Sequence, residues 1–237
     1  MNSFTSSREK KRYVREMFNG IFDKYDFLNH LLSAGVDKRW RRKAIVISGL
    51  KQGEFFLDVA CGTGDLSIEA SKRKPGKIVA VDFAEKMLAA FIEKKQKSNF
   101  DGMIEIVQAD AEKLPFNGRT FDVVSVAFGV RNFGDMQAGL KEMHRVLKEN
   151  GRVVVLEFSK PKIVIFRSLY FFYFRRILPL IGRIFSPYGK AYNYLPESVS
   201  AFPDGKEFEG EMAKAGFREV KSIPLTFGIA TLYVGKS

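Results

Sequence analysis

Cysteine and histidine, the residues that form disulfides and bind zinc, are scarce in this chain: its 237 residues include one cysteine and two histidines. One cysteine excludes a disulfide within the chain, and with two histidines it leaves no credible zinc cluster. No uninterrupted apolar run approaches the roughly 18 residues that a membrane-spanning helix needs. The first residues, MNSFTSSREKKR, also lack the apolar core of a signal peptide. We therefore expect a metal-free protein of the reducing cytoplasm.

Acidic residues are few relative to basic ones, 27 against 39, and the net charge is +12. Residues 160–190 contribute much of this imbalance, because they hold seven basic residues, no acid and aromatic runs such as residues 169–174. Charges that interrupt an apolar segment every few residues favour an interfacial helix on the inner face of the cytoplasmic membrane. A buried lid helix with snorkelling basic side chains is the alternative. A nucleic-acid surface fits less well, since its aromatic residues would be spaced as stacking platforms.

The most informative motif is the glycine-rich stretch LDVACGTGD, which runs from Leu57 to Asp65. A second apolar run, residues 77–82, follows it and ends in Asp82. A strand, a turn with Gly62 and Gly64, a helix and a second strand that ends in an acid are typical of a nucleoside-binding βαβ unit. Asp82 is then predicted to bind the ribose hydroxyls.

The same motif discriminates between cofactors. A dinucleotide fingerprint has a third glycine where Ser67 stands. Asp65 occupies the start of the helix, where a pyrophosphate would otherwise bind against the positive end of the helix dipole. A carboxylate there repels phosphate and attracts a cation. S-adenosylmethionine carries a sulfonium and an ammonium but no phosphate, so we predict S-adenosylmethionine rather than NAD.

Strands that alternate with helices predict an α/β fold with a doubly wound, mostly parallel, seven-stranded sheet. The expected strands are 55–60, 77–82, 103–109, 121–127, 152–158, 217–223 and 227–235, the last two as an antiparallel hairpin at the edge. The expected helices are 8–20, 22–32, 38–50, 65–74, 84–97, 135–149 and 205–215.

Ligands of such sheets bind at the carboxyl ends of the strands. Four separate segments reach that edge in the predicted fold: residues 62–65, Asp82, Asp110 with Ala111, and residues 128–132. Their convergence is a stronger indication of a binding site than any one segment alone.

Four further runs are specific to one family. They are Tyr25-Asp26-Phe27-Leu28-Asn29 with Ser33-x-Gly35 and Trp40; Phe128-Gly129-Val130-Arg131-Asn132; Arg145-Val146-Leu147-Lys148 with Gly151 and Leu156-Glu157-Phe158-Ser159; and Tyr194-Leu195-Pro196-Glu197-Ser198 with Phe202-Pro203. From about Tyr13 to its C-terminus, the chain resembles the ubiquinone/menaquinone biosynthesis C-methyltransferases, a class I S-adenosylmethionine family. It departs from the family pattern at Asp37, where a histidine is usual, and at Glu149-Asn150, where Pro-Gly is usual.

The resemblance implies C-methylation of a polyprenylated quinol ring, here of demethylmenaquinol to menaquinol, because an aspartate at position 37 looks more like the menaquinone-making branch. Methylation of 2-polyprenyl-6-methoxy-1,4-benzoquinol for ubiquinone is the alternative, followed by an RNA-directed methyltransferase and a non-catalytic scaffold. We expect residues 1–50 to form a helical cap and residues 51–237 the methyltransferase domain, with a basic aromatic insert at about 160–195. A membrane surface is an expected partner, nucleic acid is not, and a homodimer is an open alternative to a monomer.

The candidate catalytic residues are Arg131, Asn132 and Tyr25. Arg131 is predicted to stabilise a phenolate on the acceptor while Asn132 and Tyr25 orient the ring; the alternative for Arg131 is a structural pair with a nearby acid. The candidate cofactor-binding residues are Asp58, Gly62, Thr63, Gly64, Asp65, Asp82, Asp110 and Ala111. No metal ion is expected.

Overall fold

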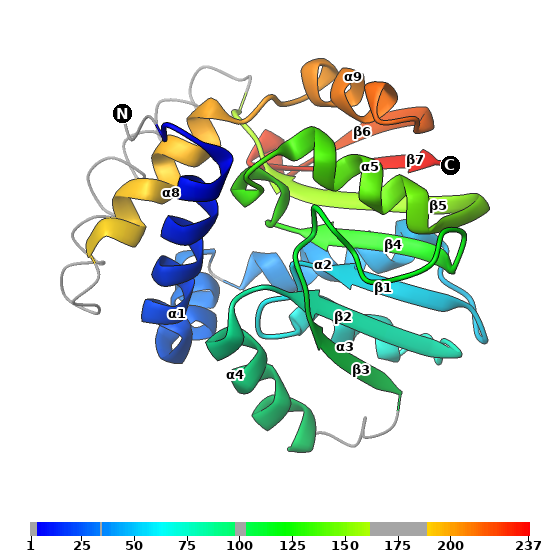
Figure 1. The fold of residues 1–237 in the computed structure, drawn as a ribbon, viewed down its shortest axis with the longest axis horizontal. Helices are drawn as coiled ribbons and strands as arrows, with labels where there is room; N and C mark the ends of the chain where they lie inside the picture. The colour runs from blue at the N-terminus through cyan, green and yellow to red at the C-terminus, as the bar shows by residue number, and fades with distance from the viewer. Residues whose placement is uncertain (1–3, 34, 98–102, 162–188) are drawn as a thin grey trace.

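The computed structural model describes residues 4–33, 35–97, 103–161 and 189–237 (Figure 1). Within these ranges seven strands form one sheet in the order β3-β2-β1-β4-β5-β7-β6. The strands are β1 (Phe55–Val59), β2 (Lys77–Asp82), β3 (Ile104–Gln108), β4 (Phe121–Ala127), β5 (Leu147–Phe158), β6 (Arg218–Leu225) and β7 (Ala230–Lys236). Neighbouring strands from β3 to β5 are parallel, and β7 is antiparallel to both β5 and β6. The predicted mostly parallel sheet with an antiparallel C-terminal pair is confirmed.

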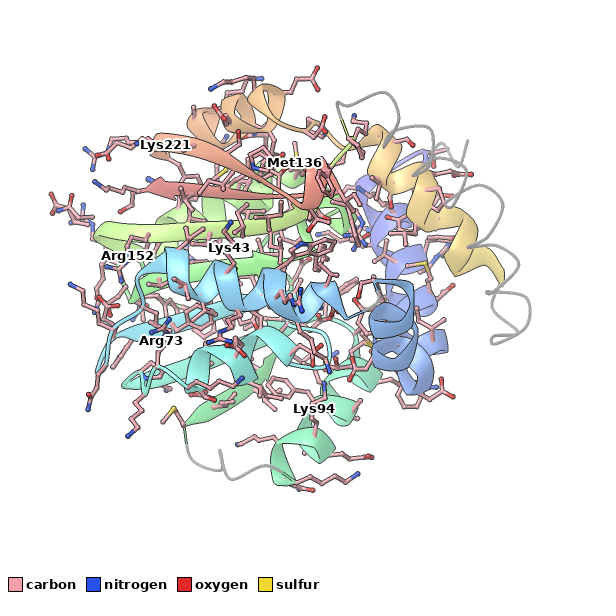
Figure 2. All side chains as sticks on the ribbon, turned by 180° about the vertical axis from the view of Figure 1, so that it is seen from behind. Lys43, Arg73, Lys94, Met136, Arg152 and Lys221 are labelled. Carbon is pink, nitrogen blue, oxygen red and sulfur yellow. The ribbon has the colours of Figure 1, made fainter. Side chains whose placement is uncertain are left out.

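Helices cover both faces of the sheet and its carboxyl edge. They are α1 (Ser7–Leu32), α2 (Val36–Ser48), α3 (Asp65–Ser71), α4 (Glu85–Gln96), α5 (Met136–Val146), α8 (Gly189–Ala201) and α9 (Lys206–Lys214), with the 3-10 turns η1 (Val130–Asn132) and η3 (Thr226–Gly228). Figure 1 shows α5 and α9 on the near face. Figure 2, seen from behind, shows α2, which carries Lys43, in front of the strands. Helices α1 and α8 contact each other beyond the carboxyl ends of the parallel strands (Figure 1).

The central strands are mostly apolar because both of their faces are buried. Successive side chains of a strand point to opposite faces. In β1, Phe56 packs in a cluster with Trp40 and Phe91, whereas Leu57 packs in the opposite cluster with Met143. Burial of each such side chain stabilises the fold by about 1.5–3 kcal/mol. The continuous apolar runs of the sequence are therefore the pattern that a helix-covered parallel sheet requires.

The N-terminal segment forms one helix, so the prediction of two helices, 8–20 and 22–32, was wrong. Helix α1 continues for 26 residues through Gly20. A glycine in a helix interior costs about 1 kcal/mol relative to alanine, which weakens a helix without ending it. Contacts with α4 offset this cost: Arg15 forms an ion pair with Glu85 at 3.0 Å, and the Asn19 side chain accepts a hydrogen bond from the Lys86 backbone N–H.

Two further boundaries differ from the prediction. Helix α5 ends at Val146 rather than at residue 149, because Leu147 is extended and pairs with Phe121 as the first residue of β5. The register then jumps to Val123 and Arg152, so the four intervening residues of β5 form an irregular excursion. Helix α8 was not predicted; it includes Pro196, a residue that disfavours helix interiors.

The predicted basic aromatic insert, at about 160–195, lies mostly outside the described residues, since these stop at residue 161 and resume at residue 189. Its membrane role therefore stays a prediction, as does the division of the chain at residue 50. Across the described ranges, none of the helices combines the length and apolar character that crossing a bilayer requires.

Gly64 permits the turn between β1 and α3, and we expect Gly64→Ala to destabilise the fold. Its φ of +82° is a left-handed conformation, and an added Cβ would lie 2.1 Å from Cε2 of Phe91. Strain and overpacking together should lower the free energy of unfolding by about 2–4 kcal/mol, as measured by urea denaturation. Gly210→Ala is the control, because a Cβ at this α9 position meets nothing within 4 Å; it should stabilise by about 0.5–1 kcal/mol. Equal stability of the Gly64 variant and the wild type would contradict this account.

Candidate active site

Asp82 is held at the tip of β2 by the backbone of two loops. Its Oδ2 accepts a hydrogen bond from the N–H of Gly62 at 2.9 Å, and its Oδ1 accepts one from the N–H of Ala84 at 2.9 Å. Burial raises the pKa of Asp82, and these backbone hydrogen bonds partly offset the rise. Each carboxylate oxygen keeps a second lone pair. The carboxylate is therefore rigid and able to accept two more hydrogen bonds, which fits a ribose diol.

A cavity that is partly open to solvent lies beside Asp82, and its empty space is about 630 Å³ when the solvent-open part is included. Its polar walls include Lys11, Asp82, Asp110, Glu112 and Asn132. Its apolar walls include Phe18, Tyr25, Phe83, Met87, Phe128 and Phe133. These residues come from the carboxyl edge of the sheet and from α1, which covers that edge (Figure 1). The cavity thus has the mixed apolar and polar lining that is typical of small-molecule sites.

Asp110 and Ala111 line the cavity beyond the end of β3, as predicted from the sequence. Lys11 of α1 bonds to Oδ2 of Asp110 at 2.6 Å and to Oε2 of Glu112 at 2.6 Å. Asp110 also fixes its own loop, since its Oδ1 accepts a hydrogen bond from the N–H of Glu112. This end of the cavity is therefore acidic, with one lysine from α1 shared between two carboxylates.

The other predicted cofactor residues lie around the start of α3. Thr63 donates a hydrogen bond from its hydroxyl to Asp26 of α1. Lys94 of α4 bonds to both Asp26 and Asp65, each at 2.6 Å. Thr63, Gly64 and Asp65 are therefore close to the cavity wall at Gly62 without being among the residues that line it.

Asp58 lies below this turn and is 1 % exposed. Its Oδ2 accepts a hydrogen bond from the hydroxyl of Ser67 at 2.6 Å, while its Oδ1 is buried with no partner among the described residues. Burial raises the pKa of Asp58 to about 7, although Ser67 and Arg41 oppose the rise. Asp58 thus joins β1 to α3 through Ser67 and is not a wall of the cavity.

Arg131 pairs with a buried acid, which was the alternative to its predicted catalytic role. Its Nη1 bonds to Oε1 of Glu157 at 2.6 Å, and the two side chains are 8 % and 0 % exposed. The same nitrogen donates to the carbonyl of Phe128. The guanidinium also lies 5.4 Å from the ring centre of Phe158. Arg131 is absent from the cavity lining, so the structure places it behind the wall, with its Nε buried and unpaired among the described residues.

Asn132 and Tyr25, by contrast, both line the cavity. Asn132 lies at the end of η1 and donates from Nδ2 to the carbonyl of Phe128 at 3.3 Å, which leaves its buried Oδ1 without a described partner. Tyr25 comes from α1, and its ring lies edge-on to Phe18, with the centres 5.8 Å apart. Two of the three predicted catalytic residues therefore share one cavity with Asp82.

Sequence reasoning assigned no role to Lys11 or Glu157. Glu157 carried the signal that identified Asp82, an acid at the end of an apolar strand, and could have been found by it. Lys11 carried no signal, because basic residues are frequent throughout residues 8–15. Within the described ranges, no group of three or more histidine, cysteine, aspartate or glutamate side chains could hold a metal ion.

Comparison with known proteins agrees with this geometry. Residues 5–237 match the profile of the ubiE/COQ5 methyltransferase family. The chain belongs to this family. A relative from Geotalea uraniireducens, the ubiquinone/menaquinone biosynthesis C-methyltransferase UbiE, is 47 % identical over 230 residues, which are 96 % of this chain and 97 % of that one. The demethylmenaquinone methyltransferase of Thermus thermophilus is 45 % identical over 220 residues, which are 92 % and 99 % of the two chains.

Solved structures show the same fold. One described as an SAM-dependent methyltransferase, possible histamine N-methyltransferase, from Thermotoga maritima has a TM-score of 0.66 and 17 % identity, and the match covers 94 % of this chain and 99 % of that one. A SAM-dependent methyltransferase from Aquifex aeolicus has a TM-score of 0.60 and 20 % identity over 83 % and 88 %. The resemblance to a family of methyltransferases and the predicted fold are both confirmed for this member of the ubiE/COQ5 family.

In this methyltransferase we expect Asp82→Asn to weaken cofactor binding, because an amide nitrogen would face one of the two backbone N–H donors and the ribose would lose a charged acceptor. The Kd for S-adenosylmethionine, measured by calorimetry, should rise about 10- to 100-fold. Asp122→Asn is the matched control: Asp122 also accepts a backbone hydrogen bond, from Phe55, but near the amino end of β4. An unchanged Kd in Asp82→Asn, or equal changes in both variants, would rule out the assignment.

Proposed function

We propose that this chain catalyses the S-adenosylmethionine-dependent C-methylation of a polyprenylated quinol ring, converting demethylmenaquinol to menaquinol. One observation carries the proposal: a single cavity is lined by Asp82, Asp110, Asn132 and Tyr25. Groups suited to a cationic nucleoside and groups suited to an aromatic hydroxyl compound thus face the same space. The names of the Geotalea and Thermus relatives support a quinone as the acceptor.

S-adenosylmethionine is the cofactor that this site fits, and it supplies an electrophilic methyl group on sulfur. Asp82 would hold the ribose, and Asp110 with Ala111 the adenine. Asp58, Gly62, Thr63, Gly64 and Asp65 surround the turn that would hold the amino-acid end. The acids give this edge the negative charge that a sulfonium and an ammonium require, and the paired Lys11 and Lys94 limit that charge.

The remaining residues activate the acceptor. A neutral ring carbon is a poor nucleophile, and ionisation of the neighbouring hydroxyl moves charge onto that carbon. A phenol-like hydroxyl has a pKa of about 10, so ionisation at pH 7 costs roughly 4 kcal/mol. The Nε–H of Arg131 is a charged donor in a dry environment, and Glu157 fixes the guanidinium through Nη1. We assign to Arg131 the stabilisation of the phenolate, and to Asn132 and Tyr25 the orientation of the ring.

The menaquinone branch is proposed over the ubiquinone branch on the names of relatives. Chains from Thermus thermophilus and Bacteroides fragilis, 45 % and 38 % identical, are both demethylmenaquinone methyltransferases. Asp37, which suggested this branch in the sequence, is buried and forms an ion pair with Arg41, and it accepts a hydrogen bond from Ser33 at 2.6 Å. Its role is therefore to anchor the start of α2.

A prenylated acceptor resides in a membrane, which supports peripheral attachment of the enzyme to the inner face of the cytoplasmic membrane. The segment proposed for this contact, residues 160–190, is described only at its ends. Attachment through this segment and a homodimer both stay predictions.

The substrate assignment is tested with a labelled methyl donor. Purified protein in detergent is offered reduced demethylmenaquinone and, separately, 2-polyprenyl-6-methoxy-1,4-benzoquinol. We expect label to enter the demethylmenaquinol ring. Label in the benzoquinol alone would show that the enzyme acts in ubiquinone synthesis instead. Label in neither compound would reject the proposed function.

Arg131→Ala tests the catalytic assignment. Loss of the charged donor should lower kcat/KM for the quinol about 100- to 1,000-fold, while the Kd of S-adenosylmethionine stays within twofold because the described bonds of Arg131 are to Phe128, Glu157 and Lys10, none of which is a candidate cofactor-binding residue. Arg218→Ala removes an arginine that bonds only to the chain terminus, Ser237, in the described contacts, and should leave turnover unchanged. Wild-type turnover of Arg131→Ala at saturating quinol would exclude a catalytic role.

A further inference from the structure

Three buried polar atoms without a described partner belong to residues that meet behind one wall of the cavity. They are Nε of Arg131, Oδ1 of Asn132 and the hydroxyl of Tyr194. Burial of a polar atom without a hydrogen bond costs free energy, so native proteins retain few of them. Arg131 and Asn132 are adjacent in η1, and α8, which carries Tyr194, packs against η1. The three residues therefore lie on two neighbouring elements, η1 and α8.

Tyr194 is positioned by packing alone. Its side chain is 5 % exposed, and its ring lies against Tyr13 of α1, with the ring centres 5.6 Å apart. Helix α8 contacts α1 and η1 together, as the adjacent ribbons of α8 and α1 in Figure 1 show. The ring is thus clamped between elements, while nothing in the described chain bonds to its hydroxyl.

The electrostatic environment keeps this hydroxyl protonated. Burial raises the pKa of Tyr194 to about 12; the positive charge of Arg131 lowers it, and Tyr13 and Glu157 raise it further. Tyr194 is therefore an O–H donor at neutral pH.

The side chains of Arg131 and Asn132 are each held by hydrogen bonds through one nitrogen, while another polar atom of each has no described partner. Arg131 uses Nη1 on Glu157 and on the carbonyl of Phe128, and its buried Nε–H has no described partner. Asn132 uses Nδ2 on the same carbonyl, and its buried Oδ1 has no described partner. Among these three buried atoms, Arg131 Nε and the Tyr194 hydroxyl are donors and Asn132 Oδ1 is an acceptor. An aromatic hydroxyl is their complement, because its oxygen accepts two hydrogen bonds and its proton is donated to a third group.

We infer that Tyr194 is a further acceptor-binding residue, whose hydroxyl donates a hydrogen bond to the ring oxygen that Arg131 and Asn132 also hold. The inference rests on the proposed function, since it takes the acceptor to be a hydroxylated ring. It gives α8 a role in binding the acceptor, because Tyr194 of α8 would bond to the same oxygen as Arg131 and Asn132 of η1. As the oxygen becomes negative, the hydrogen bonds from Tyr194 and Arg131 strengthen, so both favour the ionised ring.

Tyr194→Phe tests the inference, since it removes one oxygen and preserves the ring. We expect kcat/KM for demethylmenaquinol to fall about 10- to 100-fold, with no change in the Kd of S-adenosylmethionine. Thermal stability without ligands should be equal to or above that of the wild type, because the lost hydroxyl had no described partner. The matched control is Tyr233→Phe: the Tyr233 hydroxyl is also buried, but it accepts a hydrogen bond from the Gly205 N–H. That variant should lose stability and keep turnover.

A binding measurement separates this inference from the proposed function. The probes are 1-naphthol, which has one ring hydroxyl, and naphthalene, which has none. The wild type should prefer 1-naphthol, and Tyr194→Phe should lower that preference about tenfold. If the wild type methylates no quinol while the preference falls as expected, the hydroxyl site stands and the proposed reaction fails. If the wild type is active and Tyr194→Phe retains both its kcat/KM and its preference, the inference is overturned. A marked loss of stability in Tyr194→Phe would also overturn it.

Discussion

The site depends on one buried carboxylate. Asp82 accepts hydrogen bonds from the N–H groups of Gly62 and Ala84, and so joins the loop after β1 to the loop after β2. Hydrogen bonds to a charged group contribute about 1.5–3 kcal/mol each. The loop after β1 needs such restraint, since Ala60, Gly62 and Gly64 all have positive φ values. The same two bonds that fix these strained turns also set the direction of the lone pairs that remain for a ligand.

Around this carboxylate, ion pairs connect side chains that belong to different helices and loops. Lys94 of α4 joins Asp26 of α1 to Asp65 of α3, and Lys11 of α1 joins Asp110 to Glu112. The edge thereby keeps acidic groups close together without an uncompensated repulsion. The Arg131–Glu157 pair follows the same principle, and both of its side chains are almost completely buried.

Much of this arrangement could be predicted because parallel strands bring their carboxyl ends to one edge. That rule placed Asp82, Asp110 and Asn132 around one cavity from the alternation of apolar runs and acids alone. The rule gives positions along the chain but not the partners of side chains. Arg131 was placed correctly after β4, yet its ion pair with Glu157 depends on how η1 turns, and no local pattern encodes that turn.

The helices at the edge were harder to predict for a related reason. The continuity of α1 through Gly20 depends on contacts with α4, which lies more than 60 residues away in the sequence. Helix α8 tolerates Pro196 where a sequence rule would end a helix. In both cases tertiary packing outweighs a local propensity of about 1–3 kcal/mol. Predictions therefore succeed where the pattern is local and repeated, and fail where a single distant contact decides the outcome.

Helix α1 lies early in the sequence, but several of the groups that it contacts come much later. Lys11 bonds to Asp110, 99 residues on, and Lys10 bonds to the carbonyl of Arg131, 121 residues on. Tyr13 packs on Tyr194, near the end of the chain. During synthesis α1 can pack on α2 and α4 early, whereas its contacts with η1 and α8 wait until those elements are made. The packing around the cavity is therefore complete only after α8 has been synthesised, however early the glycine-rich loop is made.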